Sequence, residues 1–145
     1  MNVNMKDMLA KRVNGVHQAL FKLTDGRIGG RVAGMPAVML TTTGRKSGQK
    51  RTAMLTSPVH DEDKIVLVAS YGGDDRHPSW YLNLRDNPDV EIIGLGRSGA
   101  MTARTATTDE RSQLWPKVTA AYGGYANYQT KTDREIPLVI LEGKT

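Results

Sequence analysis

Residues 41–51 read TTTGRKSGQKR, and the rest of the chain is arranged around this stretch. Apolar runs with strand character flank it at residues 37–40 and 52–56. Two glycines bracket the tip, and four cations lie within seven residues. The pattern predicts a β-hairpin whose tip presents backbone N–H groups and Lys and Arg side chains to one pocket. Such a tip can bind a phosphate or a carboxylate tail, and the alternative interpretation is a solvated basic turn.

The composition is typical of a soluble, single-domain protein. The 145 residues are 39% hydrophobic and 24% charged, so the chain can bury a core. No apolar run could span a bilayer and no signal peptide is evident, so we expect a cytoplasmic protein. The lack of cysteine excludes disulfides, thiolate metal sites and cysteine nucleophiles. A net charge of +5 favours an anionic partner, either nucleic acid, a membrane surface or a phosphorylated small molecule.

Three helices are expected. Residues 4–23 carry apolar side chains at helical spacing with cations elsewhere, which predicts a cationic amphipathic helix. This helix can cap its own barrel, contact a second subunit as in a homodimer, or lie on anionic lipid as a peripheral membrane contact. The other two helices are predicted at residues 78–85 and from Thr108, the candidate N-cap, to residue 122.

The remaining patterns are mainly those of strands. Besides the flanks of the hairpin, strands are predicted at residues 64–70, 90–93, 100–106 and 136–141. About six mostly antiparallel strands predict a mainly-β fold with α, a small barrel with helices packed on it. We expect one domain over residues 1–145, in which a helix and a glycine-rich crossing (1–35) precede the barrel (36–142). The Gly-x-Gly-x-x-Gly motif of a dinucleotide fold does not follow any strand.

The sequence offers little for metal or serine chemistry. The histidines His17, His60 and His77 lie in unrelated elements, and no His and acid cluster has the spacing of metal ligands. Ser47 and Ser70 have no recognisable base nearby and no Gly-x-Ser-x-Gly elbow. At the end of a buried strand, the Ser70 hydroxyl can bond a ring edge or cap a turn. An enzyme built on this chain would therefore use a cofactor for the difficult step.

Three tyrosines are spaced three residues apart just after the last predicted helix. They are Tyr122, Tyr125 and Tyr128. A rigid aromatic ring with a hydroxyl can wall a pocket, stack on a flat substrate or offer a proton. Packing against the barrel is the alternative interpretation, and Trp80 and Tyr81 present the same choice.

Several separate motifs follow one another between residues 36 and 142. They are LTTTGRKSGQ at 40–49 with Arg51, VAS at 68–70 with Gly72-Gly73, PSWYLNL at 78–84 with Asn87-Pro88, Ala103-Arg104, Glu110-Arg111 with Trp115-Pro116, the tyrosine trio, and Thr132-Asp133-Arg134 before Ile136-Pro137. Together they resemble the deazaflavin-dependent nitroreductase family, class A of the split β-barrel flavin and deazaflavin oxidoreductases. Two departures stand out: residues 53–58 read AMLTSP where the family commonly has Asn-Pro-Leu and aromatics, and Tyr71 replaces a frequent lysine.

The resemblance implies a split β-barrel that binds coenzyme F420 in its reduced form. Family members transfer a hydride from this deazaflavin to an electron-poor acceptor such as a quinone, a nitroaromatic or an unsaturated lactone. The family's contacts to the phosphate and polyglutamate tail fall on Arg45, Lys46, Ser47 and Arg51 of this chain.

The resemblance also implies which residues form the site. The cofactor-binding set is Arg45, Lys46, Ser47, Gly48, Arg51, Thr52, Ala53, Met54, Leu55, Thr56, Val68, Ala69, Ser70, Tyr71, Ser79, Trp80, Tyr81, Leu82, Asn83 and Tyr125. The candidates for positioning the acceptor or relaying its proton are Ser70, Tyr122, Tyr125 and Tyr128. No metal is expected.

Other functions remain open at this point. A related split barrel can use FMN in place of the deazaflavin, although a tail richer in carboxylates suits the four-cation hairpin better. A carrier of the deazaflavin or of a lipid, without turnover, is a second alternative. Nucleic-acid binding is a third, but the single Phe and the lack of an interleaved basic and aromatic strand pattern argue against it.

Overall fold

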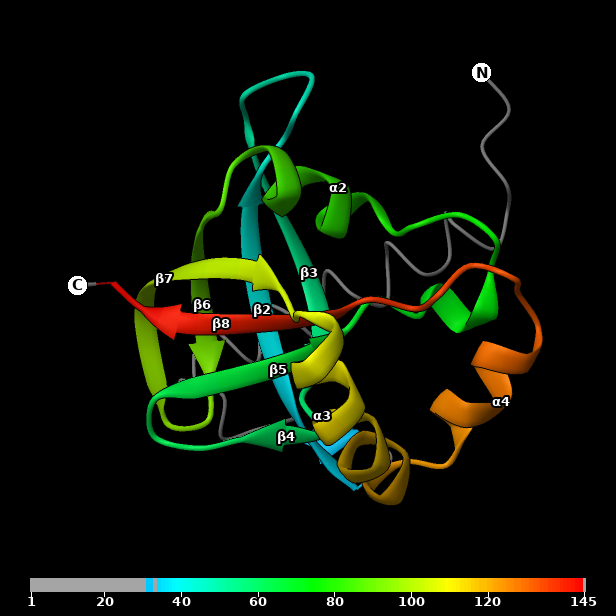
Figure 1. The fold of residues 1–145 in the computed structure, drawn as a ribbon. Coiled ribbons are helices and arrows are strands. Elements are labelled where there is room, and N and C mark those ends of the chain that lie inside the picture. The colour runs from blue at the N-terminus through cyan, green and yellow to red at the C-terminus, as the bar shows by residue number, and fades with distance from the viewer. Residues whose placement is uncertain (1–30, 33, 145) are drawn as a thin grey trace.

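The computed structural model describes residues 31–32 and 34–144 (Figure 1). The helix expected at residues 4–23 lies outside the described residues. The strands are β1 (Arg31–Val32), β2 (Met35–Thr43), β3 (Lys50–Thr56), β4 (Val59–His60), β5 (Lys64–Val68), β6 (Asp89–Gly94), β7 (Arg97–Thr105) and β8 (Leu138–Gly143). The helices are α2 (Ser79–Asp86), α3 (Thr108–Ala121) and α4 (Gly124–Thr130), with a 3-10 turn η1 (Tyr71–Gly73).

The strands form one antiparallel sheet, so the prediction of a mainly-β fold is confirmed. Its order is β1-β2-β6-β7-β8-β5-β4, and β3 also pairs with β2. The described part of the chain has eight strands, against the six or so predicted, because β1 and β4 are only two residues long. In Figure 1 the long β2–β3 hairpin crosses the group formed by β5, β8 and β7.

The turn between β6 and β7 is shorter than the sequence suggests. The strands predicted at 90–93 and 100–106 leave the glycine-rich residues 94–99 as the turn between them, but Gly94 pairs with Arg97 at the end of the two strands. Only Leu95 and Gly96 remain in the turn, with φ of 58° and 71°. Positive φ at both central residues matches the right-handed twist of the strands, which makes such two-residue turns favourable in hairpins.

The core consists of two large apolar clusters on opposite faces of the sheet and a third, small cluster around Ala37 and Met39. Strand β5 contributes to both large clusters, because its side chains alternate between the two faces. Ile65 and Leu67 pack in the first cluster, and Val66 and Val68 pack in the second. The second cluster is covered by α3 and α4, which lie over the same face (Figure 1). The continuous apolar run predicted to be a buried strand is therefore buried on both faces, as expected.

The helices match the prediction in part. Helix α2 is confirmed, and α3 is confirmed with a different cap. Its N-cap is Thr107, whose Oγ1 accepts from the Glu110 N–H (3.2 Å), while the Glu110 carboxylate accepts from the Thr107 N–H (2.9 Å). This reciprocal capping box needs an acid three residues after the cap, so Glu110 selects Thr107 over Thr108. Helix α4 was not predicted, because Gly123 and Gly124 indicated a break.

Candidate functional site

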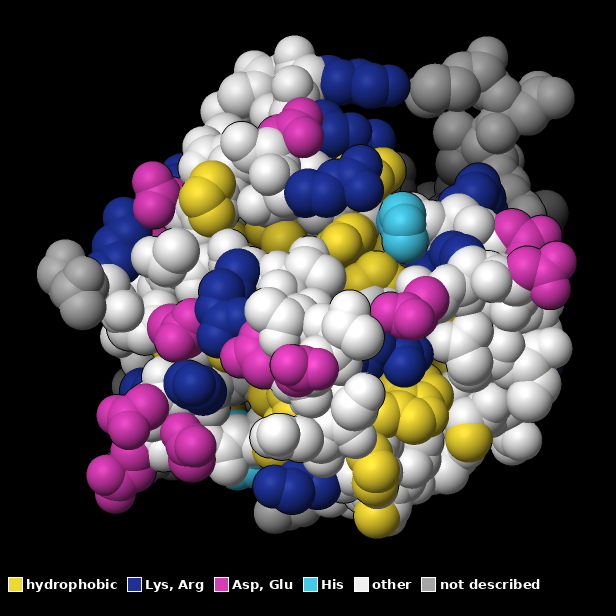
Figure 2. Space-filling model, in the orientation of Figure 1, with side chains coloured by type: hydrophobic (Ala, Val, Ile, Leu, Met, Phe, Trp, Pro, Cys, Tyr) yellow, Lys and Arg dark blue, Asp and Glu magenta, His cyan; other side chains and the backbone are white. Residues whose placement is uncertain are grey.

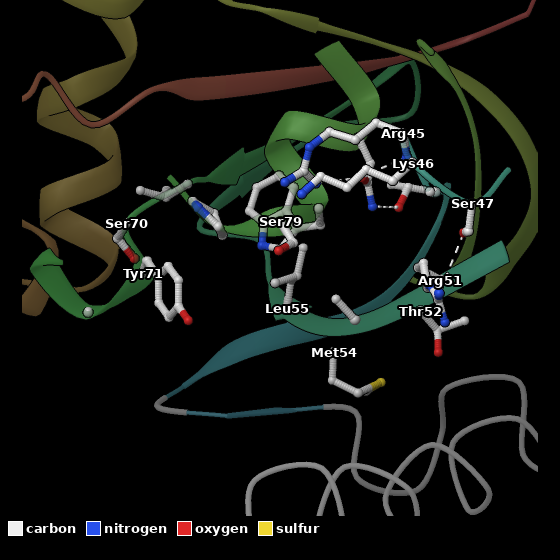
Figure 3. A pocket seen from close by; sticks show the side chains of 18 residues that line it. Arg45, Lys46, Ser47, Arg51, Thr52, Met54, Leu55, Ser70, Tyr71 and Ser79 are labelled. Carbon is white, nitrogen blue, oxygen red and sulfur yellow. Dashed lines mark hydrogen bonds between the residues drawn. The ribbon is translucent and has the colours of Figure 1, made fainter. Parts of the chain in front are cut away.

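A cavity of about 960 Å³ lies between the β2–β3 hairpin, the end of β5 and α2 (Figure 3). Its lining residues are Thr42, Gly44, Arg45, Lys46, Ser47, Arg51, Thr52, Ala53, Met54, Leu55, Val68, Ser70, Tyr71, Gly72, Pro78, Ser79, Trp80 and Asn83. Two stretches of the chain, within residues 42–55 and 68–83, thus share one space. Figure 3 shows Arg45 and Lys46 at one side of this space and Ser70 and Tyr71 at the opposite end.

The structure brings most of the predicted cofactor-binding residues to this cavity. The predicted residues outside its lining are Gly48, Thr56, Ala69, Tyr81, Leu82 and Tyr125. Tyr81 belongs to the first apolar cluster, and its hydroxyl lies 2.8 Å from the Thr105 hydroxyl. Sequence reasoning missed Thr42, Gly44, Gly72 and Pro78. Thr42 had a usable signal, since it shares a face of β2 with the buried Leu40.

The hairpin tip is closed by its own backbone. After the last pair, Thr43 with Lys50, the Gly44 N–H donates to the Gln49 carbonyl (2.7 Å). Ser47 Oγ accepts from the Gln49 N–H (3.1 Å) and from the Arg51 guanidinium (3.5 Å). A Cβ at residue 44 would lie 2.7 Å from Ser47 Oγ, so the glycine at that position allows this close turn. The residues 44–49 are called the basic turn below.

Helix α2 anchors the basic turn through one buried amide. Asn83 is only 4% exposed, and its Nδ2 donates to Thr42 Oγ1 (3.2 Å). Its Oδ1 accepts from both the backbone N–H (3.2 Å) and the guanidinium (3.0 Å) of Arg45. Because these bonds fix the base of the turn to the rigid helix, Arg45 is held at the edge of the cavity.

The cations of the hairpin differ in their pairing. Lys50 lies 3.7 Å from the Glu91 carboxylate across the sheet. Within residues 34–144, no Asp or Glu side chain forms an ion pair with Arg45, Lys46 or Arg51. Figure 2 shows Lys and Arg side chains gathered at the hairpin end of the molecule. Three positive charges therefore face one cavity without a compensating acid from the described chain, which favours an anionic ligand.

The opposite end of the cavity is formed by residues 69–77, called the wall loop below. Tyr71, Gly72 and Gly73 have φ of 47°, 63° and 85° in succession. Tyr71 is 45% exposed, and its ring borders the cavity in Figure 3. Within the part of the chain that the structure describes, the Ser70 hydroxyl has no hydrogen-bond partner, so it can bond a ligand.

The three tyrosines form a cluster beside the cavity and not in its lining. The rings of Tyr122 and Tyr125 meet edge to face at 5.1 Å, and the hydroxyls of Tyr122 and Tyr128 lie 3.4 Å apart. The Tyr125 hydroxyl lies 3.0 Å from Thr56 Oγ1, which connects the cluster to the end of β3. Burial raises the pKa of Tyr125, and the hydrogen bond with Tyr122 raises that of Tyr128. Both hydroxyls therefore stay protonated at neutral pH and can donate.

Two other classes of site find no support among the described residues. No group of three or more His, Asp and Glu side chains is placed to hold a metal ion among residues 34–144. Nor does any helix in the described residues combine the length and apolar character needed to cross a bilayer. The cavity is thus the main candidate site that the described residues offer.

Known proteins match this chain over most of its length. A sequence profile described as F420H(2)-dependent quinone reductase matches residues 13–143. An F420H(2)-dependent quinone reductase of Mycobacterium tuberculosis is 44% identical over 130 residues, which is 87% of each chain. The solved structure of an F420-H2 dependent reductase is 46% identical, with a TM-score of 0.67, and covers 74% of this chain and 94% of its own. Another, described as a domain-swapped dimer, is 40% identical, with a TM-score of 0.69, and covers 90% and 99%.

Proposed function

The chain belongs to the F420H(2)-dependent quinone reductase family, and on this premise we propose that it uses reduced coenzyme F420 to reduce a quinone. The observation that carries the proposal is the cavity, which has a basic turn on one side and apolar strand and helix residues on the other. F420 combines a flat deazaflavin with an anionic phosphate and polyglutamate tail. Both halves of that molecule therefore meet residues of matching chemistry in one space.

The residues present fit the cofactor at the basic turn. Arg45, Lys46 and Arg51 would hold the anionic tail, because they face the cavity and lack a carboxylate partner among the described residues. Met54 and Leu55 would flank the ring from β3 (Figure 3). When bound, the reduced deazaflavin supplies a hydride. The role of the protein is to hold donor and acceptor in a fixed geometry and to exclude water.

The wall loop and the tyrosine cluster supply candidate proton donors. Ser70 borders the cavity with a hydroxyl that no described residue engages. We propose that Ser70 orients the acceptor, and that Tyr122, Tyr125 or Tyr128 stabilises the oxygen that gains negative charge. The hydroxyls of Tyr125 and Tyr128 stay protonated at neutral pH, which suits that role, because a donor already in place needs no reorganisation when the charge appears.

The architecture of the sheet suggests why the cavity lies where it does. Strands β3 and β5 approach each other but are not paired in the sheet. We propose that the sheet of this single domain, residues 1–145, curves into a split β-barrel with β3 and β5 on the two sides of the opening. Thr52 to Leu55 on one side and Val68 on the other line the cavity at that opening.

The range of acceptors and the assembly state are further parts of the proposal. We propose quinones as the main acceptors because the family is described as quinone reductases. Nitroaromatics and unsaturated lactones share the electron-poor character that hydride transfer requires, so we include them as acceptors. A relative of solved structure is described as a domain-swapped dimer, and we propose that this chain also forms a homodimer. Light scattering of the purified protein tests that last point.

The function is tested by two titrations of the same purified sample. F420 and FMN are titrated in parallel and followed by fluorescence, and reduced F420 is then oxidised with menadione as the acceptor. We expect saturable binding of F420, weak or no binding of FMN, and loss of reduced F420 absorbance that depends on both enzyme and menadione.

The alternatives give different results in this experiment. An FMN enzyme would bind FMN more tightly than F420, although the matched relatives give this alternative no support. A carrier would bind F420 and show no oxidation with menadione or any nitro compound. Either result would overturn the proposed reductase.

A further inference from the structure

We propose that Arg134 is a positioning residue that holds the wall loop, and so fixes the end of the cavity that carries Ser70 and Tyr71. The effect of Arg134 on catalysis rests on the proposed function, whereas the contacts between Arg134 and the wall loop are independent of it. Arg134 lies outside the cavity lining, in the segment between α4 and β8. It therefore acts on a ligand through the loop and not by contact.

The guanidinium of Arg134 donates to three backbone carbonyls of the wall loop. Nε donates to the carbonyl of Asp74 (2.8 Å), and the terminal nitrogens donate to those of Ala69 (3.2 Å) and Ser70 (2.9 Å). Among the described residues, no carboxylate forms an ion pair with it. The five N–H donors of a planar guanidinium are spread over three nitrogens, so it can reach carbonyls that lie too far apart for the single nitrogen of a lysine ammonium.

The wall loop needs such support because its backbone is strained. Three successive residues have positive φ, and Tyr71 is a bulky non-glycine residue in that region. A residue of this kind costs roughly 1 kcal/mol and persists only where the surroundings determine its conformation. Two hydrogen bonds of η1 close the turn, from the Gly73 N–H to the Ser70 carbonyl and from the Asp74 N–H to the Tyr71 carbonyl. Arg134 binds the Ser70 carbonyl from outside the turn, and so braces it.

Arg134 also connects the two loop segments that line this end of the cavity. Its terminal nitrogen lies 3.2 Å from Nδ1 of His77, the residue before the lining residues Pro78 and Ser79. Since a guanidinium only donates, Nδ1 of His77 accepts, which puts the ring proton of neutral His77 on Nε2. One side chain thus sets the spacing between Ser70 and the start of α2.

Arg134 is itself held in place by α4 and its own turn. Gln129 in α4 donates from Nε2 to the Arg134 carbonyl (2.8 Å). The Arg134 N–H donates to Thr132 Oγ1 (3.3 Å), and Thr132 is only 9% exposed. Helix α4 therefore fixes Arg134, and Arg134 in turn fixes the wall loop. A loop fixed in this way to a rigid helix presents its side chains to a ligand in a well-defined position.

The chain contains a matched control for this contact. Arg97 donates to the carbonyls of Glu62 (2.7 Å) and Asp61 (3.0 Å) in another exposed loop. That loop contributes no residue to the cavity lining. Arg97→Ala therefore removes the same chemistry from a comparable loop without touching the candidate site.

The test compares Arg134→Ala, Arg134→Lys and Arg97→Ala by amide hydrogen exchange in the protein without cofactor. We expect Arg134→Ala to speed exchange at Gly73 and Asp74 by roughly tenfold or more, because the turn they close is no longer braced. Arg134→Lys gives a smaller increase. Exchange in β5 and β8 stays as in the wild type, and Arg97→Ala speeds exchange only around residues 61–64.

A second readout connects the loop to the ligand. We expect Arg134→Ala to raise the F420 dissociation constant roughly fivefold and to lower kcat, with partial restoration by millimolar guanidinium chloride but not by sodium chloride. Unchanged exchange at Gly73 and Asp74, or equal loss of protection throughout the sheet, would overturn the positioning role. If the wild type fails to bind F420, the proposed function is lost, whereas the exchange data still decide whether Arg134 holds the loop.

Discussion

The two ends of the cavity are built on different principles. The basic turn at residues 44–49 is closed by bonds between near neighbours, such as the Gly44 N–H to the Gln49 carbonyl. The wall loop at residues 69–77 is held by Arg134, which lies some sixty residues further along the chain and binds three of its carbonyls. The charged end is therefore local in sequence, and the end that carries Ser70 depends on tertiary contacts.

This difference indicates how the two ends respond to change. The Lys46 side chain in the basic turn is exposed, so replacing it alters the charge and leaves the backbone in place. The wall loop has a strained backbone and is closely packed at Gly73, so a small change at that position alters the fold of the loop. We thus expect substitutions in the turn to affect ligand affinity first, and substitutions in the wall to affect stability first.

The largest expected effect is that of Gly73→Ala in the wall loop. The added Cβ would lie 2.8 Å from the Tyr128 carbonyl oxygen and 3.1 Å from the Lys131 Cβ, at a φ of 85°. We expect a loss of about 3 kcal/mol in the free energy of unfolding, from the backbone conformation and the clash together. Urea denaturation measures this loss.

Two other glycines serve as controls for the close approach. Gly72 in the wall loop and Gly48 in the basic turn also have positive φ, but a Cβ at either would meet no atom within 4 Å. Gly72→Ala and Gly48→Ala should each lower the free energy of unfolding by about 1 kcal/mol, which is the cost of the positive φ without a clash. If all three substitutions cost the same, the wall loop is no more tightly packed than the turn.

The same contrast explains what could be predicted from the sequence. The strands around the turn and the buried strand at 65–68 follow from local apolar patterns, and the structure confirms them. The cations Arg45, Lys46 and Arg51 were found because they are near one another in the sequence. Signals of this kind are carried by a few consecutive residues, so periodicity and spacing detect them.

The parts that were not predicted depend on distant contacts. Helix α4 follows two glycines that locally favour a break, and it is stabilised by packing of Tyr125 in the second apolar cluster. Spacing alone also gave no sign that Arg134 and His77 meet, because 57 positions separate them. Residues so distant in the sequence, such as Arg134 and His77, are brought together only by the tertiary fold, which local patterns in one sequence do not encode.

The next effect in size concerns the basic turn. We expect Lys46→Ala to raise the dissociation constant for F420 roughly tenfold, which is about 1.4 kcal/mol, because one charge-assisted contact to the tail is lost. Lys50→Ala is the matched control, since Lys50 already lies 3.7 Å from Glu91. Fluorescence titration of both variants measures the difference. Equal dissociation constants for Lys46→Ala and the wild type would remove the turn from the site.

A smaller effect is expected far from both ends, at the start of α3. Glu110 binds Arg104 through two bonds of 2.7 and 2.8 Å, and bonds from Arg104 and from the Thr107 N–H lower the pKa of Glu110 to about 2. We expect Glu110→Gln to lose about 1 kcal/mol of unfolding free energy at pH 7. Because the folded pKa lies below the usual value, this stability is present above about pH 4.5 and is lost as the pH falls through 2.

Unfolding of Glu110→Gln and wild type by urea at pH 7 and near pH 2 measures this dependence. The difference between the two proteins should shrink strongly as the pH falls toward 2, where the folded wild-type carboxylate becomes about half protonated. F420 affinity should not change, because neither Glu110 nor Arg104 lines the cavity. A change in affinity would mean that the start of α3 is coupled to the cavity.

The smallest expected effect separates the two ends by pH. Burial, followed by the charges of Arg134 and Arg85, lowers the pKa of His77 in the wall loop below its ordinary 6.5. The unfolded chain therefore binds a proton more readily, and the stability due to neutral His77 is present above pH 6.5 and is lost as the pH falls through the folded pKa. Protonation also removes the acceptor for Arg134 and puts two cations side by side.

We expect amide exchange at Gly73 and Asp74, corrected for the intrinsic rate, to rise roughly threefold as the pH falls from 7 to 5. The basic turn contains no histidine, so the Gly48 amide, which donates to the Gly44 carbonyl, provides the internal reference. In His77→Asn the rise at Gly73 and Asp74 should disappear, since the replaced side chain does not titrate. An equal rise in that variant would assign the pH response to another group and would leave the wall loop no more sensitive to protons than the turn.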